Sequence, residues 1–260
     1  MRCQYREKYY KCGNYMEVNI YPVFKTASRR KKKAKTTSEV MQKYNQSARE
    51  NKLIRILNAN FTEEDMQINL SYTNDNHPES DEQAIKEMQN FLKRLNYSRE
   101  KNNLPKLKYV AVTEKGKRSG RYHHHLVISG GVSPAEIARI WGRGYVMTNP
   151  LQFDETGLVG IAKYLIKNPI GTKKRWCESK GLIHPPAKTR DGRLSKRKVL
   201  ELARDTENAR EYEKYYEGYY LAEADKLLND VNGGVYIHAR FYKKEADLQC
   251  RRKPRTTLRV

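Results

Sequence analysis

Two strand-like stretches joined by a turn containing glycine decide the fold: LKYVAVTE (107–114), KGKRSG (115–120) and RYHHHLVIS (121–129). β-Branched and aromatic residues dominate both stretches, which is typical of a β-hairpin. If the turn is centred on the bond that follows residue 118, Glu114 lies directly opposite His123 in the paired strands. The hairpin is therefore predicted to set a carboxylate beside an imidazole.

The alternation of side chains along a strand separates the three histidines. His123 and His125 fall on one face, whereas His124 falls on the other face with Leu126, where we predict a structural role. Cβ atoms of paired residues lie about 4.5–5.5 Å apart, so Glu114 would meet both imidazoles of its face. The pattern predicts a three-ligand metal site of Glu114, His123 and His125. The alternative is that the histidines are polar residues on a solvated strand face.

Helical and strand patterns alternate around this hairpin. Apolar residues recur at helical spacing or alternate with polar ones, and a serine followed by proline begins one helix. In order, the segments are a strand at 66–73, a helix at 81–100, the hairpin, a helix at 133–142, a short strand near 144–147 and a helix at about 157–167. This order predicts an α+β fold with a central antiparallel sheet and helices packed on it, not a doubly wound parallel sheet.

Composition divides the chain into three regions. Residues 1–60 form a basic N-terminal arm with a strand at 16–24 and a helix at about 38–58, in which Pro22 favours an edge strand or a bend. Residues 61–185 form the α+β core. Residues 186–260 form a basic helical extension that ends in a strand.

The extension is predicted to contain one long helix, at about 195–229, before the final strand at 233–244. Five tyrosines at helical spacing would form one stripe on this helix, for core or interface packing. They are Tyr212, Tyr215, Tyr216, Tyr219 and Tyr220.

The charge of the chain favours a polyanionic partner. Its 260 residues include 52 Lys or Arg against 30 Asp or Glu, a formal net charge of +22. Such an excess is typical of proteins that bind DNA or RNA, and a basic membrane-surface protein is the rival interpretation. No apolar stretch approaches the roughly 20 residues of a bilayer span, and no secretory signal is visible, so we expect no integral membrane segment. Four cysteines without a C-x-x-C pair fit reduced thiols in a cytosolic compartment.

Cations that stand together or beside an aromatic ring are candidate DNA contacts. A basic run in the N-terminal arm would bind phosphates, and a cluster after residue 172 adds a stacking ring to its charges. The candidates are Arg30, Lys31, Lys32, Lys33, Arg121, Lys173, Lys174, Arg175 and Trp176.

A tyrosine and a lysine share one helix face in GLVGIAKYLIKNP (157–169). Tyr164 and Lys167 are three residues apart. A metal ion that polarises a phosphorus atom, with an ammonium that steadies the developing phenolate, would activate a tyrosine as a nucleophile. By itself, however, a Y-x-x-K pair is more often an ordinary helix surface.

Taken together, the strand QINLSYT, Glu114, the block GRYHHHLVISGG and the block GLVGIAKYLIKNP resemble the HUH endonuclease superfamily. More narrowly, they resemble the replication initiators (Rep) of rolling-circle phages and plasmids that have a single catalytic tyrosine. The resemblance covers about residues 65 to 180 and implies a ferredoxin-like, RRM-like sheet. It implies that His123 and His125 are metal ligands with Glu114 as the third. It implies equally that Tyr164 is the nucleophile and Lys167 its helper. His124 departs from the pattern, because this position is usually a large hydrophobic residue.

The resemblance also implies an activity. Single-stranded DNA at a replication origin would be nicked through a 5′-phosphotyrosine intermediate and rejoined, with Mn²⁺ or Mg²⁺ as cofactor. A host helicase and a host polymerase would be partners, in a bacterial cytoplasm, with no membrane involved. The alternatives are a non-catalytic regulator that binds nucleic acid, and an HUH transposase or conjugative relaxase. The oligomeric state does not follow from the sequence.

Overall fold

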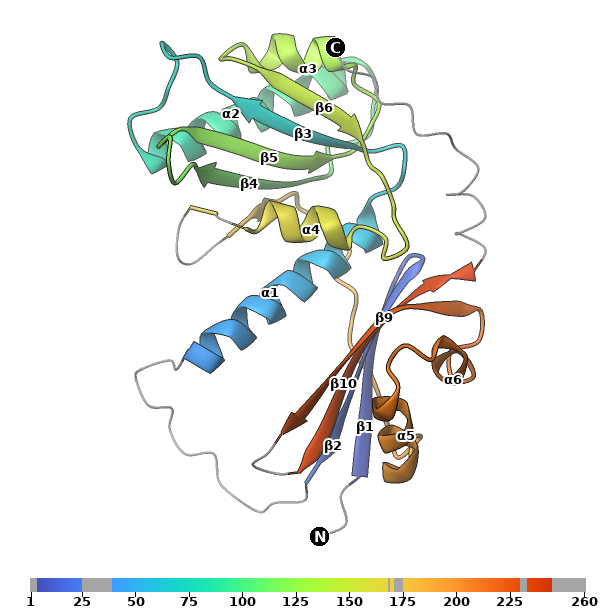
Figure 1. Ribbon diagram of the computed structural model, residues 1–260. Helices are drawn as coiled ribbons and strands as arrows, with labels where there is room; N and C mark the ends of the chain where they lie inside the picture. Colours follow the sequence, from blue (N-terminus) through green and yellow to red (C-terminus); the bar gives the residue numbers. More distant parts are fainter. Residues whose placement is uncertain (1–3, 25–38, 168, 171–174, 230–232, 245–260) are drawn as a thin grey trace. The chain divides into compact units, whose positions relative to one another are not determined.

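The computed structural model describes residues 4–24, 39–167, 169–170, 175–229 and 233–244, and it divides the chain into two compact units (Figure 1). The histidine unit consists of Asn60–Gln152 and Val159–Ile183. The terminal unit comes from Met1–Ala59, Phe153–Leu158 and His184–Val260. Each unit contains one antiparallel five-stranded sheet, so the predicted α+β class is confirmed.

The histidine unit has a sheet with the strand order β6-β3-β5-β4-β7. Its elements in chain order are β3 (Met66–Ser71), α2 (Asp81–Lys101), β4 (Tyr109–Lys115), β5 (Tyr122–Ile128), α3 (Pro134–Trp141), β6 (Val146–Pro150), α4 (Val159–Leu165) and β7 (Cys177–Glu178). The strands and helices predicted between residues 66 and 167 are all present. Their ends differ from the predicted ones by a few residues.

Side-chain caps start the two helices that cover one face of this sheet. Ser80 accepts a hydrogen bond from the Gln83 amide at the start of α2, and Ser133 accepts one from the Glu136 amide at the start of α3. These bonds satisfy backbone donors that have no partner within the helix. α3 ends at Gly142, which adopts the left-handed conformation.

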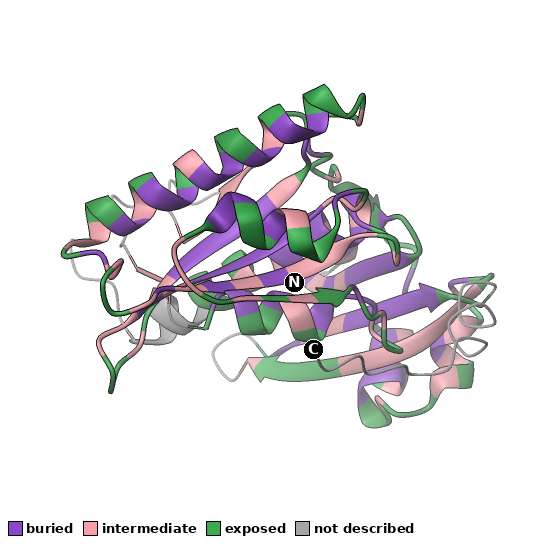
Figure 2. Ribbon diagram, turned by 90° about the horizontal axis from the view of Figure 1, so that it is seen from above, coloured by how far each residue is buried: buried purple, intermediate pink, exposed green. Residues whose placement is uncertain are grey.

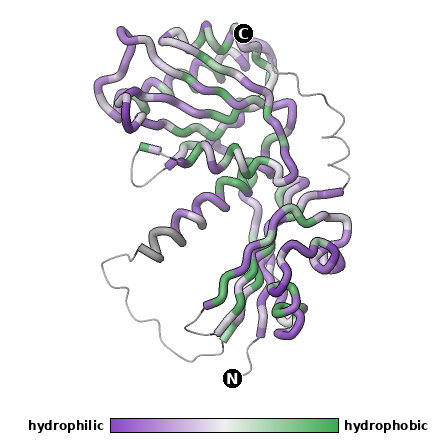
Figure 3. The backbone as a smooth tube through the Cα atoms, in the orientation of Figure 1, coloured by the Kyte–Doolittle hydropathy of each residue, from purple (hydrophilic) through white to green (hydrophobic). Residues whose placement is uncertain are grey.

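The core of the histidine unit lies between the sheet and these two helices. α2 contributes Phe91 and Leu95, α3 contributes Trp141, and the strands contribute alternate residues such as Leu70 and Leu126, all fully or almost fully buried. Hydrophobic segments recur along the strands of this sheet (Figure 3). Burial of large apolar side chains at every second strand position fixes which residues face the helices. The polar positions between them are left for the opposite face.

The terminal unit has the strand order β8-β1-β2-β10-β9. Its elements are β1 (Gln4–Cys12), β2 (Tyr15–Val23), α1 (Glu39–Asn60, which ends at the unit boundary), β8 (Lys188–Asp191), α5 (Lys196–Arg204), α6 (Ala209–Glu213), β9 (Tyr219–Asn229) and β10 (Gly234–Lys243). Val199 and Leu202 of α5 and Tyr212 of α6 pack with Val18 and Phe241 of the sheet. Buried residues run along the strands of both sheets (Figure 2).

The predicted long helix at about 195–229 is wrong. The chain forms the short helices α5 and α6 and then strand β9, which pairs with β10 from Tyr219 to Asn229. Gly218, with φ at +81°, separates α6 from this strand. The tyrosines therefore do not form one helical stripe, although Tyr212 and Tyr216 are buried in the core of the unit as packing residues.

The strand predicted at 16–24 and the helix predicted at about 38–58 are present as β2 and α1. β2 is not an edge strand, as Pro22 suggested, because β1 and β10 flank it. Pro22 pairs with Tyr5 of β1 and lies beyond Ile20, the last residue of β2 that pairs with β10. The N-terminal and C-terminal segments thus share one sheet. Among the described residues, no helix is both long and apolar enough to cross a membrane.

Candidate active site

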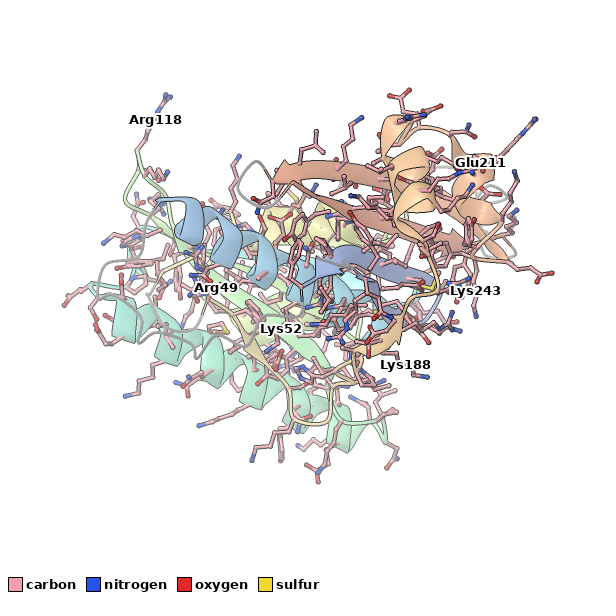
Figure 4. The ribbon with its side chains drawn as sticks, turned by 90° about the horizontal axis from the view of Figure 1, so that it is seen from below. Arg49, Lys52, Arg118, Lys188, Glu211 and Lys243 are labelled. Atoms are coloured by element: carbon pink, nitrogen blue, oxygen red, sulfur yellow. The ribbon has the colours of Figure 1, made fainter. Side chains whose placement is uncertain are left out.

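The β4–β5 hairpin has the predicted register. Glu114 pairs with His123, and Lys115 pairs with Tyr122 at the end of the ladder. Within the turn, the amide of Gly116 donates to the carbonyl of Arg121 at 2.8 Å. Arg118 projects from the tip of this turn away from the body of the unit (Figure 4). The hairpin therefore fixes Glu114 and His123 as cross-strand neighbours.

His125 is held between two polar partners on the sheet face opposite α2 and α3. Its Nδ1 lies 2.8 Å from Oδ1 of Asn69, a residue that pairs with it from the neighbouring strand β3. Its Nε2 lies 3.2 Å from Oε2 of Glu114. Because an amide oxygen only accepts, Nδ1 carries the proton that it donates to Asn69. In the neutral ring, Nε2 then presents a lone pair to the carboxylate.

Burial makes a neutral His125 the favoured state. It lowers the pKa of His125 below the usual range, and the opposing pull of the Glu114 carboxylate does not cancel this effect. Burial also lowers the pKa of His123, with Arg121 and His77 adding to the effect and Glu114 opposing it. Neutral imidazoles are the form that binds metal ions.

The chemistry of this donor set fits a divalent cation. A neutral Nε2 and a carboxylate oxygen are both acceptors, and two acceptors 3.2 Å apart are stabilised by a cation between them. The Asn69 contact has the form of the outer hydrogen bond that orients metal-binding histidines. Across the part of the chain that the structure describes, however, no three His, Cys, Asp or Glu side chains are already arranged around a metal position. Glu114 and His125 form the contact pair of the predicted set, and His123 is the neighbour of Glu114 across the strand pair.

His124 faces the core, as the alternation of the strand predicts. It is fully buried, with one ring nitrogen 2.6 Å from the Tyr72 hydroxyl and the other 2.9 Å from the Thr113 hydroxyl. Burial lowers the pKa of His124 to about 3, so the ring is neutral. Edge-on contacts with the rings of Tyr72 and Trp141 complete its surroundings. The structural role predicted for His124 agrees with this position.

Tyr164, on α4, lies over the same sheet face as His125. The two ring centroids are 4.9 Å apart with an interplanar angle of 76°. The side chain is 45% exposed, so its phenol is accessible. Burial raises the pKa of Tyr164, and the negative charge of Glu114 raises it further. A cation beside Glu114 would oppose the second effect.

The chain after α4 returns to the sheet beside Glu114. The amide of Ile170 donates to the carbonyl of Thr113 at 2.9 Å, and Pro169 forms a bridge with Glu114. Lys167 is exposed between these two anchors, and its backbone amide lies 3.4 Å from the Tyr164 carbonyl. The backbone thus keeps Lys167 close to Tyr164, although Lys167 follows the end of the helix and does not share its face as predicted.

The predicted DNA contacts lie in different places. Arg121 donates to the Tyr72 carbonyl and to Asn74, both at 2.6 Å, two residues before His123. Trp176 is half-buried and donates to Glu178 at 2.9 Å, and Arg175 is half-buried beside it. The remaining six candidates lie outside the described residues: Arg30, Lys31, Lys32, Lys33, Lys173 and Lys174.

Asn69 is the site residue that sequence reasoning missed. The alternation of QINLSYT assigned it to a polar strand face, but its partner depends on the pairing of β3 with β5. A polar residue at the centre of an otherwise apolar strand was the available signal.

One comparison with known proteins identifies this region. The family model of the Replication-associated protein ORF2 type matches residues 65–169. This match confirms the resemblance to Rep-type replication initiators and supports a role in the initiation of DNA replication. It is consistent with the HUH superfamily. The replication-associated segment contains Asn69, Glu114, the three histidines, Tyr164 and Lys167, and it spans less than half of the chain. No curated protein and no solved structure matches the chain.

Proposed function

We propose that the histidine unit nicks and rejoins single-stranded DNA at a replication origin, with Tyr164 as the nucleophile. The observation that supports this proposal most strongly is the contact between an accessible tyrosine and a buried histidine–carboxylate pair. Tyr164 packs edge-on against His125, whose Nε2 lies 3.2 Å from Glu114. The match to a replication-associated family accounts for the presence of these residues together.

Glu114, His123 and His125 would hold Mn²⁺ or Mg²⁺ in this proposal. When bound, the ion would supply positive charge to the oxygens of one DNA phosphate and so favour attack at its phosphorus. Asn69 keeps His125 in the tautomer that presents Nε2, and burial keeps the ring neutral.

The residues of the chain would perform a reversible transesterification. The Tyr164 oxygen forms a bond to phosphorus and loses its proton, while the bond from phosphorus to the 3′ oxygen of the preceding nucleotide breaks. The leaving oxygen takes up a proton and becomes a free 3′-hydroxyl, and the 5′-phosphate stays on Tyr164. The ammonium of Lys167 would stabilise the developing phenolate. Attack by another 3′-hydroxyl reverses these steps, so rejoining needs no ATP.

The same proposal assigns the remaining steps to the host. A host polymerase would extend the free 3′-hydroxyl, and a host helicase would separate the strands, since the sequence has no phosphate-binding loop of the ATPase type. A transposase or relaxase would use the same residues on different DNA. A non-catalytic regulator would bind DNA without cleaving it.

Incubation of the full chain with pooled single-stranded oligonucleotides tests the proposal. With Mn²⁺, we expect a protein–DNA adduct that survives denaturing electrophoresis, and we expect none with EDTA. Tyr164→Phe should remove the adduct while DNA binding changes less than threefold, because the phenol ring remains. Tyr97→Phe is the matched control, since Tyr97 is 60% exposed on α2, away from the site.

An adduct that persists in Tyr164→Phe would refute the assignment of the nucleophile. DNA binding without an adduct, for every pooled sequence and for Mn²⁺ and Mg²⁺ alike, would favour the non-catalytic regulator.

A further inference from the structure

Strand β6 presents two large exposed side chains beside the candidate active site. Tyr145, just before β6, is 75% exposed, and Met147 within β6 is 60% exposed. Most large apolar side chains of the histidine unit are buried, so this pair stands out on its surface.

The strand register shows which face of the sheet these side chains occupy. Met147 pairs with Asn69, and Asn69 pairs with His125, so the three side chains form one row across β6, β3 and β5. Val146, the intervening residue of β6, packs against the core on the opposite face. Tyr145 precedes it and returns to the face of the histidine row.

Tyr145 belongs to the adjacent row of the same face. Its carbonyl accepts a hydrogen bond from the amide of Ser71 at 2.9 Å, and Ser71 pairs with His123 of β5. The second row therefore runs from Tyr145 through Ser71 and His123 to Glu114. Adjacent strands lie about 4.8 Å apart, so Tyr145 and Met147 stand roughly 10 Å from the two histidines.

The backbone holds Tyr145 firmly in place. A Cβ atom on the preceding Gly144 would lie 2.4 Å from the Ser71 carbonyl oxygen and 2.8 Å from the Thr73 amide nitrogen. Only glycine permits this close approach of the two chains. The exposed ring therefore stands on a backbone that hydrogen bonds fix on the side of β3.

We propose that Tyr145 and Met147 form a platform on which an unpaired base of single-stranded DNA stacks, next to the phosphate that Glu114, His123 and His125 engage. This inference rests on the proposed function and names two further residues that bind its substrate. A tyrosine ring accepts any base on its π face, and a thioether fits against a flat ring without a demanding geometry.

The charge of the unit favours a nucleic acid over an apolar protein partner. The segments Asn60–Gln152 and Val159–Ile183 contain 19 Lys or Arg against 12 Asp or Glu. Arg121, two residues before His123, is anchored to the Tyr72 carbonyl and to Asn74, on the loop that follows Ser71. A strand whose phosphate lies at the histidines would thus meet a cation and an aromatic ring on the same side of the sheet.

Binding without cleavage tests the platform. Fluorescence anisotropy would compare a labelled mixed-sequence oligonucleotide with an abasic strand of the same length, both in EDTA so that no nicking is needed. In the double variant Tyr145→Ala/Met147→Ala, we expect affinity for the base-bearing strand to fall about tenfold or more. Affinity for the abasic strand and the dependence of binding on salt should stay unchanged, because the phosphate contacts remain.

Tyr145→Phe should keep wild-type affinity, since it retains the ring, and Tyr97→Ala is the matched control for an exposed tyrosine elsewhere. Equal losses for both strands, or no loss for either, would overturn the platform and favour a protein-binding surface. The result is independent of the nicking chemistry. Base-dependent loss of binding without any Tyr164 adduct would refute the proposed function alone, whereas an adduct with base-independent binding would refute the platform alone.

Discussion

Substitution of His124 by leucine should change both the stability of the histidine unit and its dependence on pH. The imidazole is fully buried, with the Tyr72 and Thr113 hydroxyls on its two nitrogens. Leucine fills a similar volume but makes neither hydrogen bond. The loss of two buried hydrogen bonds should lower the free energy of unfolding by about 1–3 kcal/mol at pH 7.

Acid should then reverse part of this difference. The pKa of His124 is lowered to about 3 in the folded chain, against about 6.5 when unfolded, so below pH 6.5 the unfolded chain binds the additional proton. The stability that a neutral His124 contributes is therefore present above pH 6.5 and is lost as the pH falls towards 3. Between pH 7 and pH 5 this loss amounts to about 2 kcal/mol in the wild type. The leucine variant has no such group, so its disadvantage should shrink or vanish at pH 5.

Urea unfolding followed by tryptophan fluorescence measures both effects. Trp141 and Trp176 are the two tryptophans of the chain, and both belong to the histidine unit. The Trp141 ring centroid is 5.7 Å from that of His124, so its emission reports on this core. If wild type and variant lose equal stability between pH 7 and pH 5, His124 is not the buried neutral group described above.

Three further substitutions test single features of the histidine unit. Asn69→Leu removes the hydrogen bond to Nδ1 of His125 and should weaken Mn²⁺ binding about 10- to 100-fold in calorimetric titration, with the fold retained by circular dichroism. Gly130→Ala would set a Cβ atom 2.1 Å from the carbonyl oxygen of Glu64 and should destabilise the unit by about 1–3 kcal/mol in urea. A variant as stable as the wild type would show that this turn yields freely. Ser133→Ala removes the cap of α3 and should cost about 1 kcal/mol in the same assay, with a null effect excluding a role for the cap.

The hairpin and the division of its faces could be predicted because their determinants are local. A short turn fixes the pairing of Glu114 with His123, and a period of two separates His124 from its neighbours. The cap at Ser133 is likewise encoded within a few residues. The positions of these side chains followed from chain geometry alone.

Long-range strand pairing could not be predicted in this way. The segment YYLAEADKLLN contains several good helix formers, yet it becomes strand β9 because β10 pairs along its whole length. Met16 pairs with Phe241 across almost the entire chain, and no local pattern signals that contact. For the same reason, the role of Asn69 became visible only when the register of β3 against β5 was known.

The most direct test of the account is to identify the residue that carries the DNA. After reaction of the full chain with single-stranded DNA and Mn²⁺, nuclease and protease digestion would leave a nucleotide on one peptide for tandem mass spectrometry. We expect the nucleotide on Tyr164, joined through its 5′-phosphate to the phenol oxygen. A nucleotide on any of the other tyrosines, or on none, would contradict a site built from Tyr164, His125 and Glu114.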